Sequence, residues 1–219
     1  MNPPALVLAS RSPRRAQLLR DEGFEFSQVD PPFEDANQPG DASSPAAVLA
    51  GSLAAHKAAS VLDAGLAGDR PDAVVLGADT IVVDQAGGLT GTPTDREQAR
   101  DMIERLIGCS HQVVTVVALV AQTCQSAGDL RTQTLVDTAT VHLGKVGPDE
   151  LQRYLDTQQW RGKAGGYNLF ERQNRWPLRV EGDPTTVVGL PMRKLVPTLL
   201  AWNIEPAGFI ANDFKTGAP

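Results

Sequence analysis

The sequence predicts a single α/β domain whose mixed β-sheet is flanked by helices. Short apolar runs of strand length alternate irregularly with segments of helical periodicity, and two pairs of strand runs are spaced as hairpins. No internal repeat or long linker divides the 219 residues, a length at which one domain buries about 70% of its unfolded surface. We assign the domain to residues 1–205 and expect a loosely ordered tail over residues 206–219.

The N-terminal half begins with a short buried strand, Ala5–Ala9, that runs into a helix. Ser12 suits the N-cap of this helix and Pro13 its first turn, because a proline has no backbone N–H to satisfy there. The helix should end near Gly23. We then expect a strand at 24–29, an acidic Pro-rich loop at 31–45, a helix at 46–64, and an apolar strand at 74–84 that breaks at Gly77–Thr80.

The C-terminal half continues with a helix that starts at a capping box of Thr94 and Glu97 and ends at Gly108. We expect the following elements to be strands at 112–122 and 132–143, a helix at 148–159, a glycine-rich loop at 162–166, a strand at 178–181, and a helix at 189–202 with Pro197 inside it. Such irregular interleaving is typical of a mixed sheet.

The composition excludes several classes of protein. A net charge of −6 argues against a nucleic-acid-binding module, which needs a basic surface. Cys109 and Cys124 stand in no zinc-ligand or CxxC pattern, as is typical of proteins from a reducing compartment. The sequence shows no signal-peptide pattern and no membrane-spanning run, so we expect a cytoplasmic protein without a membrane partner.

Two serines and three arginines lie where the first strand meets the first helix, in Ser10-Arg-Ser-Pro-Arg-Arg15. Arg14 and Arg15 fall in the first helical turn, where the helix dipole disfavours cations by about 0.3–1 kcal/mol each. The N–H groups of a helix N-terminus and arginine side chains together suit a phosphate. The alternative is a solvated basic patch.

Asp79 and Lys57 are charged residues inside apolar segments. An ionised carboxylate in the strand around Asp79 is costly to bury unless a cation, a metal or hydrogen-bond donors pair with it; the alternative is a solvated turn. Lys57 interrupts an apolar stripe of its helix, and snorkelling of its ammonium group to water explains it as well as a role in binding. Glu34 and Asp35 look like solvated loop charges.

The glycine-rich loop Gly162–Gly166 permits close approach of its backbone to a ligand, and Lys163 adds a cation. The loop lacks the spacing of a P-loop, and a plain connector is the alternative interpretation. His56, His111 and His142 are scattered without metal-ligand spacing, so we expect them to be structural or exposed.

In their order along the chain, these stretches resemble the Maf-type nucleoside triphosphate pyrophosphatases. The matching segments are Leu8–Arg15, Ala55–Ala58, Gly77–Thr80, Ser110–Thr115, Gly162–Tyr167 and Val187–Pro191. The resemblance spans about residues 5–200 and implies a fold similar to that of the inosine-triphosphate pyrophosphatases. It implies hydrolysis of a nucleoside triphosphate to the monophosphate and pyrophosphate, with a divalent cation (Mg²⁺, Mn²⁺ or Co²⁺) as cofactor and a homodimer as a common assembly.

The resemblance also implies roles for particular residues. The residues that would bind the phosphates are Ser10, Arg14, Arg15, Lys57 and Lys163. Asp79 matches the proton acceptor for the attacking water and, with Glu34, an acidic metal site. Arg14 and Thr80 match the branch of the family that prefers dTTP and UTP.

The sequence departs from the family in two places. Thr92 stands where many members have a lysine, which puts part of the phosphate stabilisation in doubt. The glutamine that is typical of the dTTP/UTP branch near the glycine loop is missing. The segment Leu169–Arg172 is more similar to the branch of the family that acts on 7-methyl-GTP, whereas Arg14 and Gly165 do not match the residues that are usual in that branch. The alternatives to a dTTP/UTP pyrophosphatase are therefore a 7-methyl-GTP pyrophosphatase and a low-turnover nucleotide-binding regulator of cell division.

Overall fold

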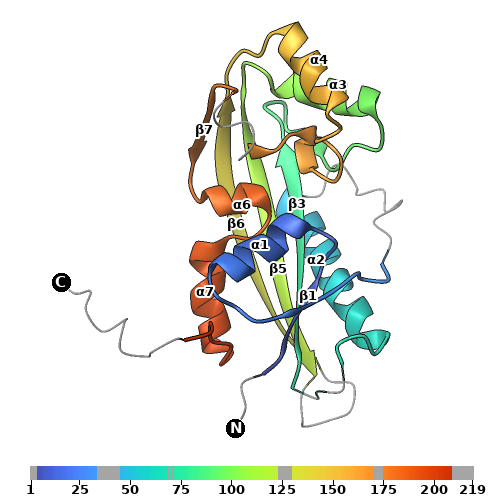
Figure 1. Ribbon diagram of the computed structural model, residues 1–219, viewed down its shortest axis with the longest axis vertical. Helices are drawn as coiled ribbons and strands as arrows, with labels where there is room; N and C mark the ends of the chain where they lie inside the picture. The colour runs from blue at the N-terminus through green and yellow to red at the C-terminus, as the bar shows by residue number, and fades with distance from the viewer. Residues whose placement is uncertain are drawn as a thin grey trace, which may run out of the picture.

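The computed structural model describes residues 4–33, 45–68, 70, 72–122, 130–169 and 175–208. Its elements follow in the order β1 (Leu6–Ala9), α1 (Pro13–Asp21), β2 (Ser27–Val29), α2 (Ala46–Asp63), β3 (Val74–Val83), β4 (Leu89–Thr90), α3 (Arg96–Leu106), β5 (Ser110–Gln122), β6 (Leu130–Leu143), α4 (Pro148–Asp156), the 3₁₀ turn η1 (Ala164–Gly166), β7 (Leu178–Glu181), α6 (Pro184–Val188) and α7 (Met192–Ala201). Figure 1 shows an elongated molecule in which β5 and β6 run along much of its length. No helix in the described ranges combines the length and the apolar character that a membrane span requires.

The strands form one mixed sheet in the order β2-β1-β3-β5-β6-β7, with β4 paired to the end of β3. β1 runs parallel to β2 and β3, whereas β5 runs antiparallel to β3 and β6, and β7 antiparallel to β6. β3 and β4 form a short hairpin, and β5 and β6 form a long one. The mixed sheet and the two hairpins predicted from the sequence are confirmed.

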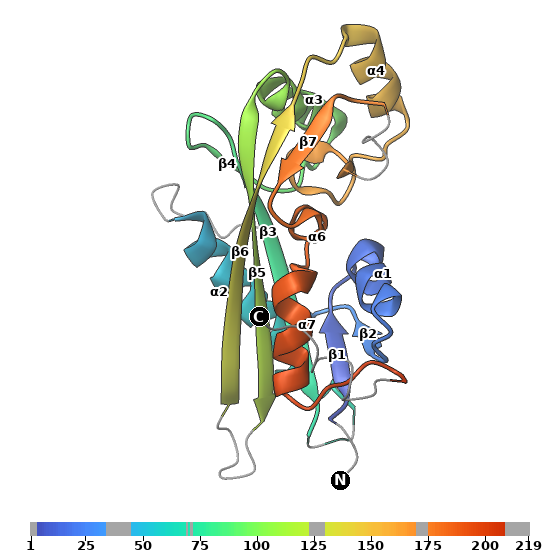
Figure 2. The same cartoon turned by 90° about the vertical axis from the view of Figure 1, so that its left-hand side faces the viewer.

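Helices cover both faces of the sheet because the side chains of its strands point alternately to one face and the other. Leu6 and Leu8 of β1 pack with α1 and α7, whereas Val7 and Ala9 pack with α2 on the opposite face. Figure 2 shows α2 on one side of β5 and β6, and α1 and α7 on the other. A further core cluster joins α3 and α4 to the upper end of the sheet.

β3 is continuous from Val74 to Val83, which corrects the expected break at Gly77–Thr80. Gly77 permits close packing of a helix on the strand and does not form a turn. A Cβ atom at Gly77 would lie 2.1 Å from the carbonyl oxygen of Ala54 and 3.0 Å from the backbone nitrogen of Ala58. The glycine therefore lets the backbone of α2 approach β3 closely.

The start of α3 lies one residue later than predicted. Its N-cap is Asp95, whose carboxylate accepts a hydrogen bond of 2.8 Å from the backbone N–H of Gln98. The side chain of Gln98 in turn accepts a hydrogen bond from the backbone N–H of Thr94. The predicted capping box of Thr94 and Glu97 is therefore wrong, because the charged Asp95 is the better acceptor at a helix N-terminus.

Other boundaries differ in ways that local patterns do not reveal. β2 has only three residues, while β5 and β6 extend further than predicted because they pair with each other along their whole length. The sequence-based assignment missed α6, a five-residue helix of Pro, Thr and Val that Asp183 caps through the backbone N–H of Thr185. Its β-branched residues have low helix propensity. The final helix, α7, starts only after Pro191.

A buried pair, His111 of β5 and Tyr167, joins the segment after η1 to the sheet. The hydroxyl of Tyr167 lies 2.7 Å from Nε2 of His111, and the two rings meet edge to face. His111 is only 2% exposed. Burial, assisted by the nearby His142, lowers the pKa of His111 to about 4, and burial raises the pKa of Tyr167. His111 is therefore neutral at neutral pH.

Replacing Gly77 with Ala should lower the free energy of unfolding by about 1–3 kcal/mol, the usual cost of overpacking a filled core. The added Cβ would meet backbone atoms of α2, which cannot turn aside as a side chain does. Chemical denaturation measures the change. Gly91→Ala is the control, since a Cβ at Gly91 meets no atom within 4 Å. Equal stabilities of the two variants would contradict the close approach.

We expect His111 to make the stability depend on pH. The unfolded chain binds a proton at this residue below pH 6.5, but the folded chain does so only near pH 4, so stability falls as the pH drops between these values, by up to about 3 kcal/mol. His111→Gln should flatten this part of the profile in denaturation experiments. Tyr167→Phe keeps His111 buried and should preserve the slope. A slope that survives in His111→Gln would show that other groups cause it.

Candidate active site

A pocket opens where β1 ends and β3 continues. β1 pairs with β3 as far as Ala9 and Gly77, and β4 joins β3 at Val82. The pocket, with a volume of about 610 Å³, is lined by β3 residues from the stretch between these two pairings. Crevices beyond the carboxyl ends of parallel strands are the usual ligand sites of α/β folds.

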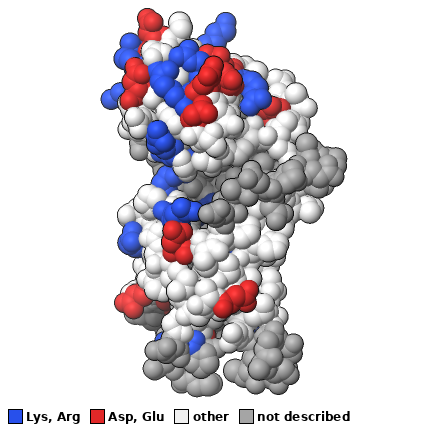
Figure 3. Space-filling view, turned by 90° about the vertical axis from the view of Figure 1, so that its right-hand side faces the viewer, with Lys and Arg blue, Asp and Glu red and all other residues white. Residues whose placement is uncertain are grey.

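Seven of the eight site residues predicted from the sequence line this one pocket. They come from the start of α1, from α2, from β3 and from the segment before η1: Ser10, Arg14, Arg15, Lys57, Asp79, Thr80 and Lys163. Figure 3 shows Lys and Arg side chains at the hollowed waist of the face in view, below the part of the molecule that carries α3 and α4. The eighth residue, Glu34, lies outside the described residues.

The N-terminus of α1 forms one wall of the pocket. The hydroxyl of Ser12 caps the helix by accepting a hydrogen bond from the backbone N–H of Arg15, and Pro13 occupies the first turn, as predicted. The backbone N–H of Ser12 donates to the hydroxyl of Ser10 at 3.2 Å. The partial positive charge of a helix N-terminus is thus directed at the same pocket as the arginines.

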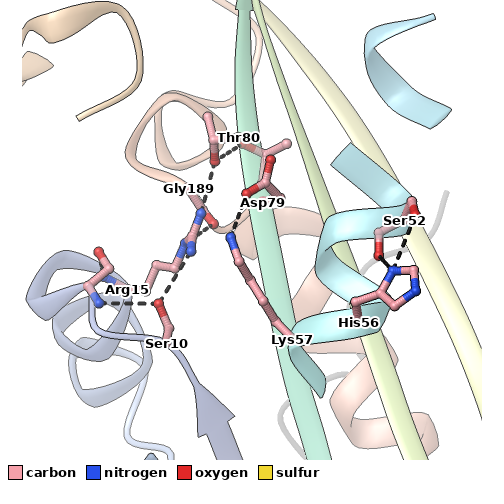
Figure 4. A network of polar contacts seen from close by, with 10 residues as sticks. Ser10, Arg15, Ser52, His56, Lys57, Asp79, Thr80 and Gly189 are labelled. Carbon is pink, nitrogen blue, oxygen red and sulfur yellow. Dashed lines mark hydrogen bonds and ion pairs between the residues drawn. The ribbon is translucent and has the colours of Figure 1, made fainter. Parts of the chain in front are cut away.

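Arg15 is held by three hydrogen bonds from its guanidinium group, as Figure 4 shows. Nε donates to the carbonyl oxygen of Gly189 at 3.0 Å, Nη1 to the hydroxyl of Ser10 at 3.3 Å, and Nη2 to the hydroxyl of Thr80 at 3.1 Å. A Cβ at Gly189 would lie 2.9 Å from Nε of Arg15, and Gly189 has a φ of +116°. Only glycine fits at that position, so the turn after α6 is shaped to receive the guanidinium group.

Lys57 and Asp79 form an ion pair with 2.7 Å between Nζ and Oδ1. Their side chains are only 10% and 13% exposed, so each charge would be costly without the other. The adjacent His56 turns away and places its Nδ1 2.7 Å from the carbonyl oxygen of Ser52, as Figure 4 shows. The interpretation of Lys57 as a snorkelling side chain is therefore wrong, because its ammonium group contacts a carboxylate in the pocket.

The glycine-rich loop closes another side of the pocket. The φ angles of Gly165 and Gly166 are +70° and +74°, and the backbone N–H of Gly165 donates to the carbonyl oxygen of Gly91. A Cβ at Gly165 would lie 3.1 Å from a methyl group of Val82, so the loop packs directly on β3. Arg14 reaches the loop through a long 3.4 Å contact with the carbonyl oxygen of Gly162. The loop is thus a wall of the pocket and not a plain connector.

Sequence reasoning missed a buried polar chain behind the pocket. The hydroxyls of Thr80 and Thr115 lie 2.9 Å apart, and the hydroxyl of Thr115 donates to the carbonyl oxygen of Thr186 at 2.7 Å. Thr115 faces Thr80 in the β3–β5 register, and a polar residue within an apolar strand was the available signal. Arg161 and Asn168 also line the pocket, and no sequence pattern had singled them out.

The described residues do not form a metal site by themselves. No group of three or more His, Cys, Asp or Glu side chains placed to hold an ion occurs among them, and Asp79 is the one carboxylate among the described residues that line the pocket. Mg²⁺ commonly binds through one or two carboxylates and the phosphates of a substrate. The donor set therefore fits a cation that binds together with a polyphosphate.

The part of the pocket lined by Val82, Val113 and Val187 is apolar. One pocket thus offers cationic groups for a polyanion, an apolar surface for a ring, and a carboxylate that can accept a proton from water.

Comparison with known proteins agrees with this geometry. The family model described as Maf-like protein matches residues 5–202. The chain is 38% identical over 200 residues to the dTTP/UTP pyrophosphatase of Hahella chejuensis, a match that covers 91% of this chain and 93% of that protein. It is 39% identical over 201 residues to the dTTP/UTP pyrophosphatase of Salinibacter ruber, covering 90% of each chain, and 36% identical over 200 residues to that of Bacillus velezensis, covering 91% and 97%. The resemblance drawn from the sequence motifs is confirmed, and the chain belongs to the Maf family.

Proposed function

We propose that this protein is a nucleoside triphosphate pyrophosphatase that converts its substrate to the nucleoside monophosphate and pyrophosphate, with dTTP and UTP preferred. The observation that carries the proposal is a carboxylate, Asp79, held by Lys57 in a pocket lined by further cations. The relatives named dTTP/UTP pyrophosphatases support both the activity and the base.

The charges of the pocket suit the triphosphate. Arg14 and Arg15 come from α1, Lys57 from α2 and Lys163 from the glycine loop, so cations surround the space beside β3. Guanidinium groups form paired hydrogen bonds with phosphate oxygens, and Arg15 is already oriented by its own contacts. These donors offset the negative charge that would otherwise repel an attacking water.

In the proposed reaction a water molecule attacks the α-phosphorus. A bond forms from the water oxygen to phosphorus, the bond from phosphorus to the oxygen that bridges to the β-phosphate breaks, and pyrophosphate leaves with the bonding electrons. Asp79 accepts the proton of the water, and Lys57 orients the carboxylate through the 2.7 Å contact. A divalent cation bound by Asp79, by the predicted ligand Glu34 and by phosphate oxygens would supply further charge neutralisation.

Two alternative functions use the same pocket. Activity on 7-methyl-GTP is favoured by the similarity of Leu169–Arg172 to that branch, although most of this segment lies outside the described residues. A low-turnover nucleotide-binding regulator is favoured by Thr92, which lines the pocket where a lysine would add a cation. A cytoplasmic location, which rests on the sequence, and a homodimer, which rests on the resemblance to the family, are also part of this proposal.

Asp79→Asn should slow pyrophosphate release from UTP by about 10²–10⁴-fold, because an amide does not accept the proton of the attacking water. The substitution preserves the size of the side chain and an oxygen for Lys57, so nucleotide binding should change much less than the rate. Release is measured with Mg²⁺, with Mn²⁺ and with a chelator. Asp101→Asn, on the exposed side of α3, is the control and should act like the wild type.

The same assay on a panel of dTTP, UTP, CTP and 7-methyl-GTP tests the choice of base. Release from the uracil and thymine nucleotides supports the proposal, whereas release from 7-methyl-GTP alone assigns the protein to the other branch. Nucleotide binding without release favours the regulator. A near-normal rate of Asp79→Asn would show that this carboxylate is not the base.

Thr92→Lys should raise kcat/KM for UTP about 3- to 10-fold, because a cation a few ångströms from the phosphates contributes about 1 kcal/mol or more. High salt should reduce the gain. The control is Thr94→Lys, which places the same charge on an exposed residue outside the pocket lining. An equal gain in both variants would mean that the added charge acts through the field of the whole protein.

A further inference from the structure

The pocket has a charged part and an apolar part that lie along β3. Thr80, whose hydroxyl accepts a hydrogen bond from Arg15, and Val82, next to the glycine loop, are two residues apart on this strand, so their side chains lie on the same face of the sheet. At about 3.3 Å per residue this places them about 7 Å from each other. A nucleotide whose phosphates lie at Arg15 therefore places its base toward Val82 and its partner in the register, Val113.

Asn168 lines the pocket just after the glycine loop, yet it is only 5% exposed. Its side-chain amide makes no hydrogen bond to any other residue in the described part of the chain. The amide also differs from the described polar atoms that have neither solvent contact nor a hydrogen-bond partner, such as Nδ1 of His111 and Nε1 of Trp176. Its polar atoms are therefore reachable, and a residue buried to this degree is reachable through the pocket that it lines.

The amide of Asn168 can hydrogen-bond to water in the pocket, and a ligand that displaces this water keeps the free energy only if it supplies the same hydrogen bonds. Other polar side chains around the pocket are already engaged: Thr80 and Thr115 bond each other, and Tyr167 bonds His111. Asn168 differs from them because its donor and acceptor are both available to a ligand.

We propose that Asn168 reads the base of the nucleotide through paired hydrogen bonds. The proposal rests on the function proposed above, which places a nucleoside triphosphate in this pocket. An amide offers an acceptor and a donor side by side. The edge of uracil and thymine offers the complement, with N3–H donating to the side-chain oxygen of Asn168 and O4 accepting from its nitrogen.

The test combines two enzymes with two substrates. Wild type and Asn168→Leu, which keeps the branched shape of the side chain without the amide, are assayed for pyrophosphate release from UTP and from N3-methyl-UTP, which lacks the N3–H. The wild type should prefer UTP about 10- to 100-fold, the range expected for a lost hydrogen bond to a buried polar group. In Asn168→Leu the ratio of the two activities should fall to about 1, because the activity on UTP falls while the activity on N3-methyl-UTP changes little.

Two further variants keep the test sharp. Asn168→Asp, of nearly the same shape, should lose UTP activity as Asn168→Leu does, because a carboxylate repels O4. Thr92→Val changes another residue that lines the pocket, and it should alter the rate of pyrophosphate release from both substrates by the same factor. A preference for UTP that survives in both Asn168 variants, with thermal unfolding unchanged, overturns the proposal.

Failure of the proposed function gives a different result. If the wild type releases pyrophosphate from no nucleotide, dissociation constants are measured instead. The wild type and Asn168→Leu are each titrated with α,β-methylene-UTP and with its N3-methyl derivative. A preference lost on substitution of Asn168 then supports base reading without catalysis. If the wild type releases pyrophosphate equally fast from UTP and from N3-methyl-UTP, the proposed pyrophosphatase activity is supported but the role of Asn168 in reading the base is wrong.

Discussion

The close approach of α2 to β3 at Gly77 is the constraint on which the pocket depends. Lys57 follows the α2 residue that Gly77 touches by one turn, and Asp79 follows Gly77 by two positions on the strand. A side chain at Gly77 would hold the helix away and separate Nζ from the carboxylate, which now lie 2.7 Å apart. The packing that buries the two charges is thus also the packing that pairs them, as a buried ion pair requires.

The local charge of the pocket is opposite to the charge of the whole protein. The chain carries a formal net charge of −6, but the described lining includes arginines and lysines from three segments and one carboxylate, Asp79. Net charge governs solubility and long-range steering, whereas a ligand in a concave site responds to the groups around it. The acidic composition therefore argues against an extended nucleic-acid surface but does not argue against a pocket for a small polyanion.

Local patterns in the sequence predicted most of the site because its residues stand in unusual places: arginines in a first helical turn, and Asp79 inside an apolar strand. The partner of Asp79 was not predictable in this way, since contact between α2 and β3 depends on tertiary packing. Gly77 was misinterpreted because a glycine within a strand marks either a turn or a close approach of backbone. Two further features depend on neighbours that are distant in sequence: the formation of α6, and the accessibility of the Asn168 amide to a ligand. No local sequence pattern predicts either of them.

The residues that line the pocket are divided between packed elements of the fold and connecting segments. Arg15, Lys57 and Asp79 lie on α1, α2 and β3, whose positions are fixed by the core on both faces of the sheet. Thr92, Lys163 and Asn168 lie in connecting segments. Connecting segments accept substitutions more readily than packed elements do. A change of residue in a connecting segment can therefore alter the lining of the pocket while Asp79 and Arg15 keep their positions. The departures from the family pattern at Thr92 and beyond the glycine loop are for this reason compatible with an unchanged arrangement of Arg15 and of the pair formed by Lys57 and Asp79.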